Sequence, residues 1–160
     1  MEHKLRIYLD TTVISYLDQQ DAPERMAETH RLWKMLKTGK YEIFLSQTTL
    51  DELAECEQPK RAKLAALLSE VQYTKLPSNN AVIAIAEKFI DFGVLKEKSY
   101  DDCLHISAAL VGGCDIILSW NFKHIVNHKT IAGAKAIALL EGRSELLIYA
   151  PSMLLEEEND

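Results

Sequence analysis

Residues 114–119 read Cys114-Asp115-Ile116-Ile117-Leu118-Ser119, a nearly continuous apolar run that follows a pair of glycines at 112–113. A run of this kind is typical of a strand whose two faces are both buried, as in a parallel sheet covered by helices. The segment just before it, 101–111, has the apolar spacing of a helix and is stopped by the glycine pair. A helix that leads directly into a buried strand favours an α/β fold.

The same alternation of strands and helices continues in both directions from this segment. Expected strands lie at 5–9, 41–45, 73–76 and 146–149, and expected helices at 22–37, 48–57, 60–71, 79–92 and 132–140, with a short helical turn at 13–17. This order predicts an α/β fold with a central, mostly parallel sheet of four to five strands and helices on both faces.

Length and composition favour one globular domain. The chain has 160 residues, 48% of them hydrophobic, and a formal net charge of −6. This balance is that of a folded protein rather than a disordered or collagen-like chain. We expect a single domain over 1–151 and an acidic, disordered tail over 152–160, where Glu156-Glu157-Glu158 would remain solvated.

The sequence also points to a compartment. No apolar stretch is long enough for a membrane span, and the first six residues lack the apolar core of a secretory signal. The three cysteines, Cys56, Cys103 and Cys114, form no Cys-x-x-Cys pair and are interpreted as free thiols. We therefore expect a cytoplasmic protein that is not bound to a membrane.

Four oxygen-bearing side chains fall near the strand ends. Asp10 follows the first strand, Glu52 lies in the helix after the second, Asp102 opens the helix at 101–111, and Asn121 follows the strand at 114–119. In parallel sheets, ligands bind at the carboxyl ends of the strands. Carboxylate and amide oxygens there would suit Mg²⁺ or Mn²⁺, which can promote phosphodiester hydrolysis.

Each of these residues also has a purely structural interpretation. Asp10 and either Asp101 or Asp102 are typical helix N-caps, Glu52 fits a capping box with Thr49, and Asn121 is a common turn residue. The four positions support a site only when they are taken together.

Four segments resemble motifs of PIN domains, and the resemblance as a whole runs from about Leu5 to Pro151. The segments are Ile7-Tyr8-Leu9-Asp10-Thr11-Thr12-Val13-Ile14, Ser46-Gln47-Thr48-Thr49-Leu50-Asp51-Glu52-Leu53, Asp102-Cys103-Leu104-His105-Ile106-Ser107-Ala108-Ala109 and Ile117-Leu118-Ser119-Trp120-Asn121-Phe122-Lys123-His124-Ile125. The resemblance implies a PIN-like fold and a Mg²⁺- or Mn²⁺-dependent ribonuclease. Many small members are VapC-like toxins held inactive by an antitoxin, so an antitoxin partner and a homodimer are also implied.

The resemblance assigns roles to individual residues. Asp10, Glu52 and Asp102 would be the catalytic, metal-binding acids, and Asn121 would take the fourth catalytic position, often an Asp in other members. Thr12 would support Asp10 by hydrogen bonding, and Ser119 stands where Thr is more usual. The amide of Asn121 removes one negative charge, which would weaken the binding of a second metal ion.

Other residues near these motifs are open to two interpretations. The basic group Lys123, His124, His128 and Lys129 could contact RNA, with Lys123 and His124 as the first candidates. A second basic group is Lys60, Arg61 and Lys63. For both groups, a solvated surface is the favoured interpretation. Trp120 is expected to be a packing residue, and His105 a core histidine with a satisfied hydrogen bond.

Two other functions compete with the nuclease. One is a catalytically weak or inactive PIN-like module that binds RNA or a protein partner, which Asn121 favours. The other is a phosphatase with Asp10 as nucleophile, which is disfavoured because Thr12 occupies the position where a second acid is usual.

Overall fold

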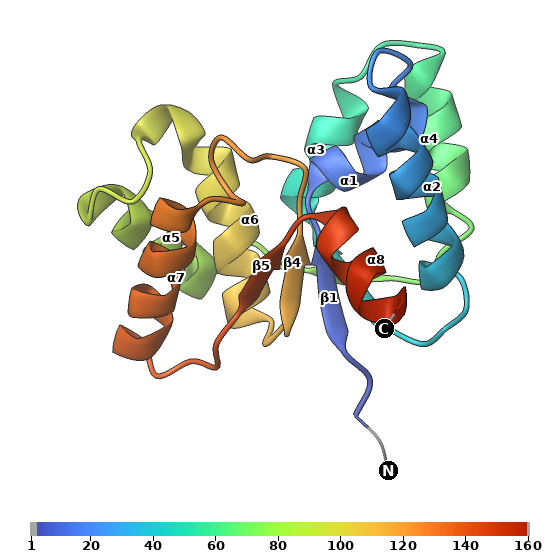
Figure 1. Cartoon of the computed structure of the whole chain (residues 1–160). Helices are drawn as coiled ribbons and strands as arrows, with labels where there is room; N and C mark the ends of the chain where they lie inside the picture. The colour runs from blue at the N-terminus through green and yellow to red at the C-terminus, as the bar shows by residue number, and fades with distance from the viewer. Residues whose placement is uncertain (1–2, 160) are drawn as a thin grey trace.

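The computed structural model describes residues 3–159 and contains one five-stranded sheet in which all neighbouring strands are parallel (Figure 1). The strands are β1 (Arg6–Leu9), β2 (Glu42–Ser46), β3 (Thr74–Leu76), β4 (Ile116–Leu118) and β5 (Leu147–Tyr149). Their order is β3-β2-β1-β4-β5, so the first strand is central. The expected fold class is confirmed.

Helices cover both faces of the sheet (Figure 1). One face carries α1 (Thr11–Ser15), α2 (Pro23–Leu36), α4 (Lys60–Leu68) and α8 (Pro151–Asn159). The other face carries α5 (Asn80–Asp91), α6 (Tyr100–Val111) and α7 (His128–Leu140). Helix α3 (Gln47–Ala54) contacts both α1 and α6, and two short 3₁₀ helices are η1 (Tyr16–Asp18) and η2 (Glu97–Ser99).

The core consists of two apolar layers, one on each side of the sheet. Tyr8 and Ile117 belong to the layer under α5, α6 and α7, whereas Ile7, Leu9 and Leu118 belong to the layer under α1, α2 and α4. All five side chains are fully shielded from solvent. Burial of both faces explains why the strand at 114–119 reads as a continuous apolar run.

Helix α7 begins at His128, earlier than the expected start at residue 132. The Asn127 side chain caps it by accepting a hydrogen bond from the Thr130 N–H at 2.9 Å. The polar residues of this first turn hide its helical character from an apolar-spacing argument, so the start of the helix was placed too late.

The prediction of a disordered tail over 152–160 is wrong for the residues that the structure describes. Pro151–Asn159 form α8, and Leu154 and Leu155 are buried. The acidic residues are also anchored, because Glu158 accepts hydrogen bonds from Lys40 and Tyr41. Charge alone suggested a solvated tail, but the two leucines bury one side of a helix.

Three residues at the ends of the chain are not described by the structure. Met1 and Glu2, part of the segment assessed for a secretory signal, and Asp160, the last residue of the acidic tail, lie outside the described residues. Within the described range 3–159, no helix combines the length and the apolarity that a membrane span requires.

Candidate active site

The side chain of Asp10 lies at the carboxyl end of the central strand. Its Oδ1 accepts a hydrogen bond from the Val13 N–H at 3.2 Å, so Asp10 is the N-cap of α1. Oδ1 also accepts from the Thr12 hydroxyl at 2.6 Å, and Oδ2 accepts from the Ser119 hydroxyl at 2.5 Å. Asp10 is thus both a helix cap and part of a polar cluster, and the two interpretations of this residue are compatible.

Asp10 is only 2% exposed. Burial raises its pKa above the ordinary value of 3.8, although the positive charge of His105 and the hydrogen bonds from Ser119, Thr12 and Val13 act in the opposite direction. The charged form of this carboxylate is therefore costly here, and a nearby cation would stabilise it.

Glu52 extends from α3 toward the same edge of the sheet. Its Oε1 accepts hydrogen bonds from the Thr11 hydroxyl and from His105 Nε2, both at 2.6 Å. Burial raises the pKa of Glu52, but the hydrogen bond and the charge of His105, with the bond from Thr11, outweigh burial, so the pKa is lowered overall.

The proposed capping-box role of Glu52 is wrong. The capping box of α3 is formed by Ser46 and Thr49 instead. Glu52 lies further along the helix than the capping residues, so its side chain is free to turn toward Thr11 and His105.

His105 connects Glu52 to the interior of the protein. Its Nδ1 lies 2.7 Å from the Tyr8 hydroxyl, which in turn lies 2.7 Å from the Ser46 hydroxyl. Burial lowers the pKa of His105, but Tyr8, Glu52 and Asp10 together raise it to about 10. The expected buried histidine with satisfied hydrogen bonds is confirmed, and its positive charge offsets part of the negative charge of the acids.

Asp102 lies in the first turn of α6 and is contacted by Asn121, which follows β4. Asn121 Nδ2 donates a hydrogen bond to Asp102 Oδ1 at 3.2 Å, and Asn121 Oδ1 accepts from the His124 N–H at 3.0 Å. Asn121 is therefore both a turn residue and a direct partner of the third acid.

The pKa of Asp102 is raised mainly by burial. Burial is the main cause that raises this pKa to about 6, and the negative charges of Asp10 and Glu52 raise it further, whereas His105 and His124 lower it. The acids thus repel one another across the edge of the sheet, as expected for carboxylates gathered without a compensating cation.

Two further acids, Asp101 and Asp51, are adjacent in sequence to the acids of the site but lie on the surface. Asp101 is exposed on the same turn as Asp102, and Asp51 accepts a hydrogen bond from Gln47 Nε2 at 2.8 Å on the surface of α3. Of the two alternatives for the third acid, Asp102 is the one that contacts Asn121. We therefore take Asp102, rather than Asp101, as the acid of the site.

Comparison with known proteins identifies the family. A family model described as "PIN domain" matches residues 6–123. The chain belongs to the PIN-domain family. Members of this family are generally nucleases. Among curated proteins, none matches the sequence significantly.

A solved structure shares the fold of this PIN domain. It is the crystal structure of VapBC2 from Rickettsia felis bound to a DNA fragment from their promoter, with a TM-score of 0.55. The match covers 91% of this chain and 98% of the other, at 13% sequence identity. At this identity the likeness concerns the fold.

We call the edge of the sheet that carries Asp10, Glu52 and Asp102 the acidic edge. It offers the carboxylate oxygens that a divalent cation prefers, although the three acids are not gathered around one point. Among the described residues, no group of three or more His, Cys, Asp or Glu side chains is close enough to hold a metal ion. Glu52 is instead paired with His105, and Asp10 with hydroxyl groups. Mg²⁺ commonly binds through one or two carboxylates and keeps several waters. Asp10 and Asp102 supply carboxylate oxygens at this edge, which is the type of donor that such a site requires.

The structure also places Trp120 and the two basic groups that the sequence singled out. Trp120 is 5% exposed, and its Nε1 donates to the Thr29 hydroxyl at 2.9 Å, which confirms its expected packing role. Lys123 is exposed and His124 is half-buried beside the site. In the second basic group, Lys60 donates to Gln19 Oε1 at 2.7 Å.

Sequence reasoning missed the connection between His105 and Glu52. The signal was the spacing of Asp102 and His105, which are three residues apart and therefore share one face of α6. The spacing alone does not reveal that Tyr8 and Glu52, from two other elements, contact the histidine.

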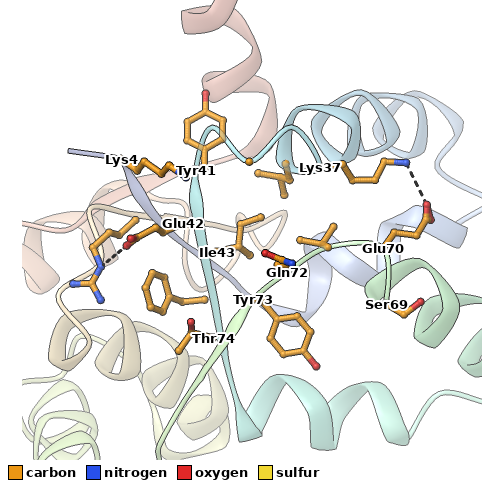
Figure 2. Close-up of a pocket in the computed structure, with 15 residues that line it drawn as sticks. Lys4, Lys37, Tyr41, Glu42, Ile43, Ser69, Glu70, Gln72, Tyr73 and Thr74 are labelled. Carbon is orange, nitrogen blue, oxygen red and sulfur yellow. Dashed lines mark hydrogen bonds and ion pairs between the residues drawn. The ribbon is translucent and has the colours of Figure 1, made fainter. Parts of the chain in front are cut away.

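A large hollow of this PIN domain lies at the other end of the sheet (Figure 2). It has a volume of about 1120 Å³ and is lined by the beginnings of β1 and β2 and by the residues before β3. Ion pairs between Arg6 and Glu42 and between Lys37 and Glu70 cross parts of it. None of the four candidate acid and amide residues lines this groove, so it is separate from the acidic edge.

Proposed function

We propose that this PIN domain is a Mg²⁺- or Mn²⁺-dependent ribonuclease that hydrolyses RNA phosphodiester bonds. The observation that supports the proposal is the arrangement of the acids in a PIN domain: Asp10 bonds to Ser119 after β4, and Asp102 bonds to Asn121 two residues further on. Glu52 lies at the same edge, bonded to Thr11 next to Asp10. Three acids that repel one another at the ligand-binding edge of a parallel sheet form an environment that attracts a divalent cation.

Asp10 and Asp102 would hold the ion, with Glu52 close by. When bound, the ion would polarise a phosphoryl oxygen and make a water molecule easier to deprotonate. The hydroxyl groups of Thr12 and Ser119 fix the orientation of Asp10, and Asn121 fixes that of Asp102. His105 holds Glu52 in its charged form.

The reaction is an in-line hydrolysis. The water oxygen forms a bond to phosphorus while the bond from phosphorus to the 3′-oxygen breaks, which leaves a 3′-hydroxyl and a 5′-phosphate. A carboxylate of the site takes up the proton of the attacking water. The leaving 3′-oxygen takes up a proton from solvent.

Cleavage of a labelled single-stranded RNA tests this function. We expect cleavage by the wild-type protein with Mg²⁺ or Mn²⁺, none in EDTA, and a loss of at least about 100-fold in Asp10→Asn and Asp102→Asn, as is usual when an essential catalytic group is removed. Asp101→Asn is the matched control and should retain activity. Equal cleavage by wild-type protein and Asp10→Asn would show that the activity comes from a contaminant or another site.

A catalytically weak module that binds RNA or protein is the second candidate. It is favoured by the carboxylates that already have hydrogen-bond partners and by the amide at Asn121. RNA binding without any cleavage in Mg²⁺ or Mn²⁺ would favour this candidate over the nuclease.

A toxin role with an antitoxin partner is a further part of the proposal, as is a homodimer. It is supported by family membership and by the fold shared with VapBC2. We also place the protein in the cytoplasm, where Cys103 and Cys114 would remain the buried free thiols that the structure shows. Growth arrest upon expression, relieved by the product of a neighbouring gene, would support the toxin role.

A further inference from the structure

A second, smaller hollow lies beside the acidic edge. It has a volume of about 240 Å³ and is formed by the connection between α5 and α6 on one side and the start of α7 with the loop before it on the other. Four lysines line it, together with His124: Lys96, Lys98, Lys123 and Lys129. No Asp or Glu is among its lining residues. We call this hollow the lysine pocket.

The positive charge of the lysine pocket is not neutralised by the protein. None of its four lysines forms an ion pair with a carboxylate in the described part of the chain, whereas Lys37, Lys40 and Lys88 elsewhere do. The whole chain carries a net charge of −6. Four like charges around one hollow in an acidic protein raise its local potential and favour an anionic ligand.

One wall of the lysine pocket is fixed by hydrogen bonds. Asn127 Nδ2 donates to the carbonyl oxygens of Phe122 and Lys123 at 3.1 and 3.0 Å, and the Thr130 hydroxyl donates to the His124 carbonyl oxygen at 2.7 Å. The loop that carries Lys123 is therefore held against the start of α7. A wall of this kind exists before a ligand arrives, so little ordering is needed on binding.

The lysine pocket adjoins the acidic edge through two residues. Ser99 lines the pocket and is the N-cap of α6, whose first turn carries Asp102. His124 also lines it, and the His124 N–H donates to Asn121, the partner of Asp102. Both connections surrounding the pocket belong to the face of the sheet covered by α5, α6 and α7 (Figure 1).

We infer that the lysine pocket binds phosphate groups of the RNA strand next to the bond that is cut. The inference rests on the proposed function. The volume is smaller than the roughly 300–1,000 Å³ of a pocket for a drug-sized molecule, so it suits phosphate groups rather than a whole nucleoside. Lysine binds phosphate as a point charge, and such contacts position a strand without reading its sequence.

The salt dependence of RNA binding tests the inference. Two double variants, Lys96→Gln/Lys98→Gln and Lys123→Gln/Lys129→Gln, are compared with wild-type protein for binding of a fluorescent single-stranded RNA in EDTA, over a series of KCl concentrations. The slope of log K against log[KCl] should become shallower by about 0.7 for each lost phosphate contact, or about 1.4 for each double variant. The control is Lys34→Gln/Lys135→Gln, whose lysines lie on α2 and α7 outside the pocket and whose slope should not change.

Cleavage kinetics supply a second readout. In Mg²⁺ or Mn²⁺, the pocket variants should raise KM several-fold with little change in kcat, because the lost contacts position the strand rather than the reacting atoms. The effect should be the same for RNAs of different sequence. If the wild-type protein cleaves RNA and the pocket variants keep both the wild-type salt slope and the wild-type KM, the inference is overturned. The nuclease proposal would still hold.

The same experiment separates the other outcomes. If the pocket variants have shallower salt slopes but the wild-type protein never cleaves RNA, the result supports phosphate binding by the lysine pocket and rejects the nuclease. RNA with a 5′-hydroxyl and RNA with a 5′-phosphate should show equal changes, because the proposed ligands are phosphates within the strand. A change confined to 5′-phosphorylated RNA, abolished by competing inorganic phosphate, would overturn that assignment in favour of a terminal phosphate.

Discussion

Glu52 and Asp102 both lie at the acidic edge of the sheet, but their surroundings shift their pKa values in opposite directions. His105 and Thr11 stabilise the charged form of Glu52, whereas burial and neighbouring acids disfavour the charged form of Asp102. A pair of titratable groups whose environments separate their pKa values is a common basis for distinct catalytic roles. In the proposed nuclease, Glu52 remains a fixed charge, and Asp102 is the acid whose charged form gains most from a bound cation.

The raised pKa of Asp102 predicts that Asp102→Asn stabilises the metal-free protein at pH 7.5. The folded state holds the Asp102 proton up to about pH 6, whereas the unfolded chain releases it near 3.8. The stability of the folded state therefore decreases as pH rises from about 4 to 6, and the full cost remains above pH 6. After allowance for partial exposure, we expect a gain of about 1 kcal/mol in the variant at pH 7.5, measured by urea unfolding in EDTA.

Asp101→Asn is the control, since it removes a charge from the same helix turn at an exposed position. The difference between the two variants should shrink toward pH 4. Mg²⁺ should stabilise wild-type protein more than Asp102→Asn, because a ligand that binds only the folded state shifts the unfolding equilibrium. Equal stability of the two variants at pH 7.5 in EDTA would contradict the assigned environment of Asp102.

At the level of elements, the contact between α7 and the connection after α5 depends on a glycine. A Cβ added to Gly133 would lie 2.6 Å from both γ carbons of Val94. Val94 also lines the lysine pocket. The missing side chain at Gly133 therefore allows the two walls of that pocket to approach each other.

Gly133→Ala should destabilise the protein although alanine is the better helix former. Helix propensity favours alanine by about 1 kcal/mol, but overpacking costs typically about 1–3 kcal/mol. We expect a net loss of about 1 kcal/mol in urea unfolding. Val94→Ala in the same chain should recover most of the loss, and a double variant no more stable than Gly133→Ala would show that this contact is not the cause.

The elements were largely predictable because their signals are local. The apolar run at Ile116–Leu118 and the helical spacing of α2 and α5 each depend on neighbouring residues, and each appears close to its expected place. The start of α7 was missed because its first turn is held by the Asn127 cap rather than by apolar spacing.

The candidate site was predictable only in part, for the same physical reason. Asp10, Glu52, Asp102 and Asn121 could be placed at one edge because strand ends of a parallel sheet meet there. The bonds of His105 to Tyr8 and Glu52 join residues distant in the chain. The lysine pocket likewise joins Lys96 and Lys98 to Lys123 and Lys129, and no local pattern reveals such a pairing.

For the whole molecule, α8 closes the apolar layer under α1, α2 and α4. Leu154 is 1% exposed within that layer. Removal of residues 151–160 would expose the layer to water, so we expect the shortened chain to unfold at a clearly lower urea concentration or to aggregate. A midpoint equal to that of the full chain would mean that α8 contributes no stability.

Point variants keep this test informative if the shortened chain does not fold. Leu154→Ala should cost about 2–5 kcal/mol, the usual range for a buried leucine. Glu156→Gln, at an exposed position on the same helix, should change the stability by less than about 0.5 kcal/mol. The charge of the last residues suggested a solvated tail, whereas the burial of Leu154 could be inferred only from the apolar layer that it completes.

β1 leaves the ribosome before the other four strands of the sheet, yet it requires a neighbour on each side. Its partner on one side is β4. Ser119, which follows β4 and bonds to Asp10, lies 109 positions after Asp10 in the sequence. A growing chain that has not yet reached Ser119 and Asn121 therefore exposes an unfinished sheet edge without an assembled acidic cluster. The proposed nuclease would become active only after Ser119 and Asn121 have left the ribosome, so a shorter nascent chain would not cut the messenger RNA from which it is being translated.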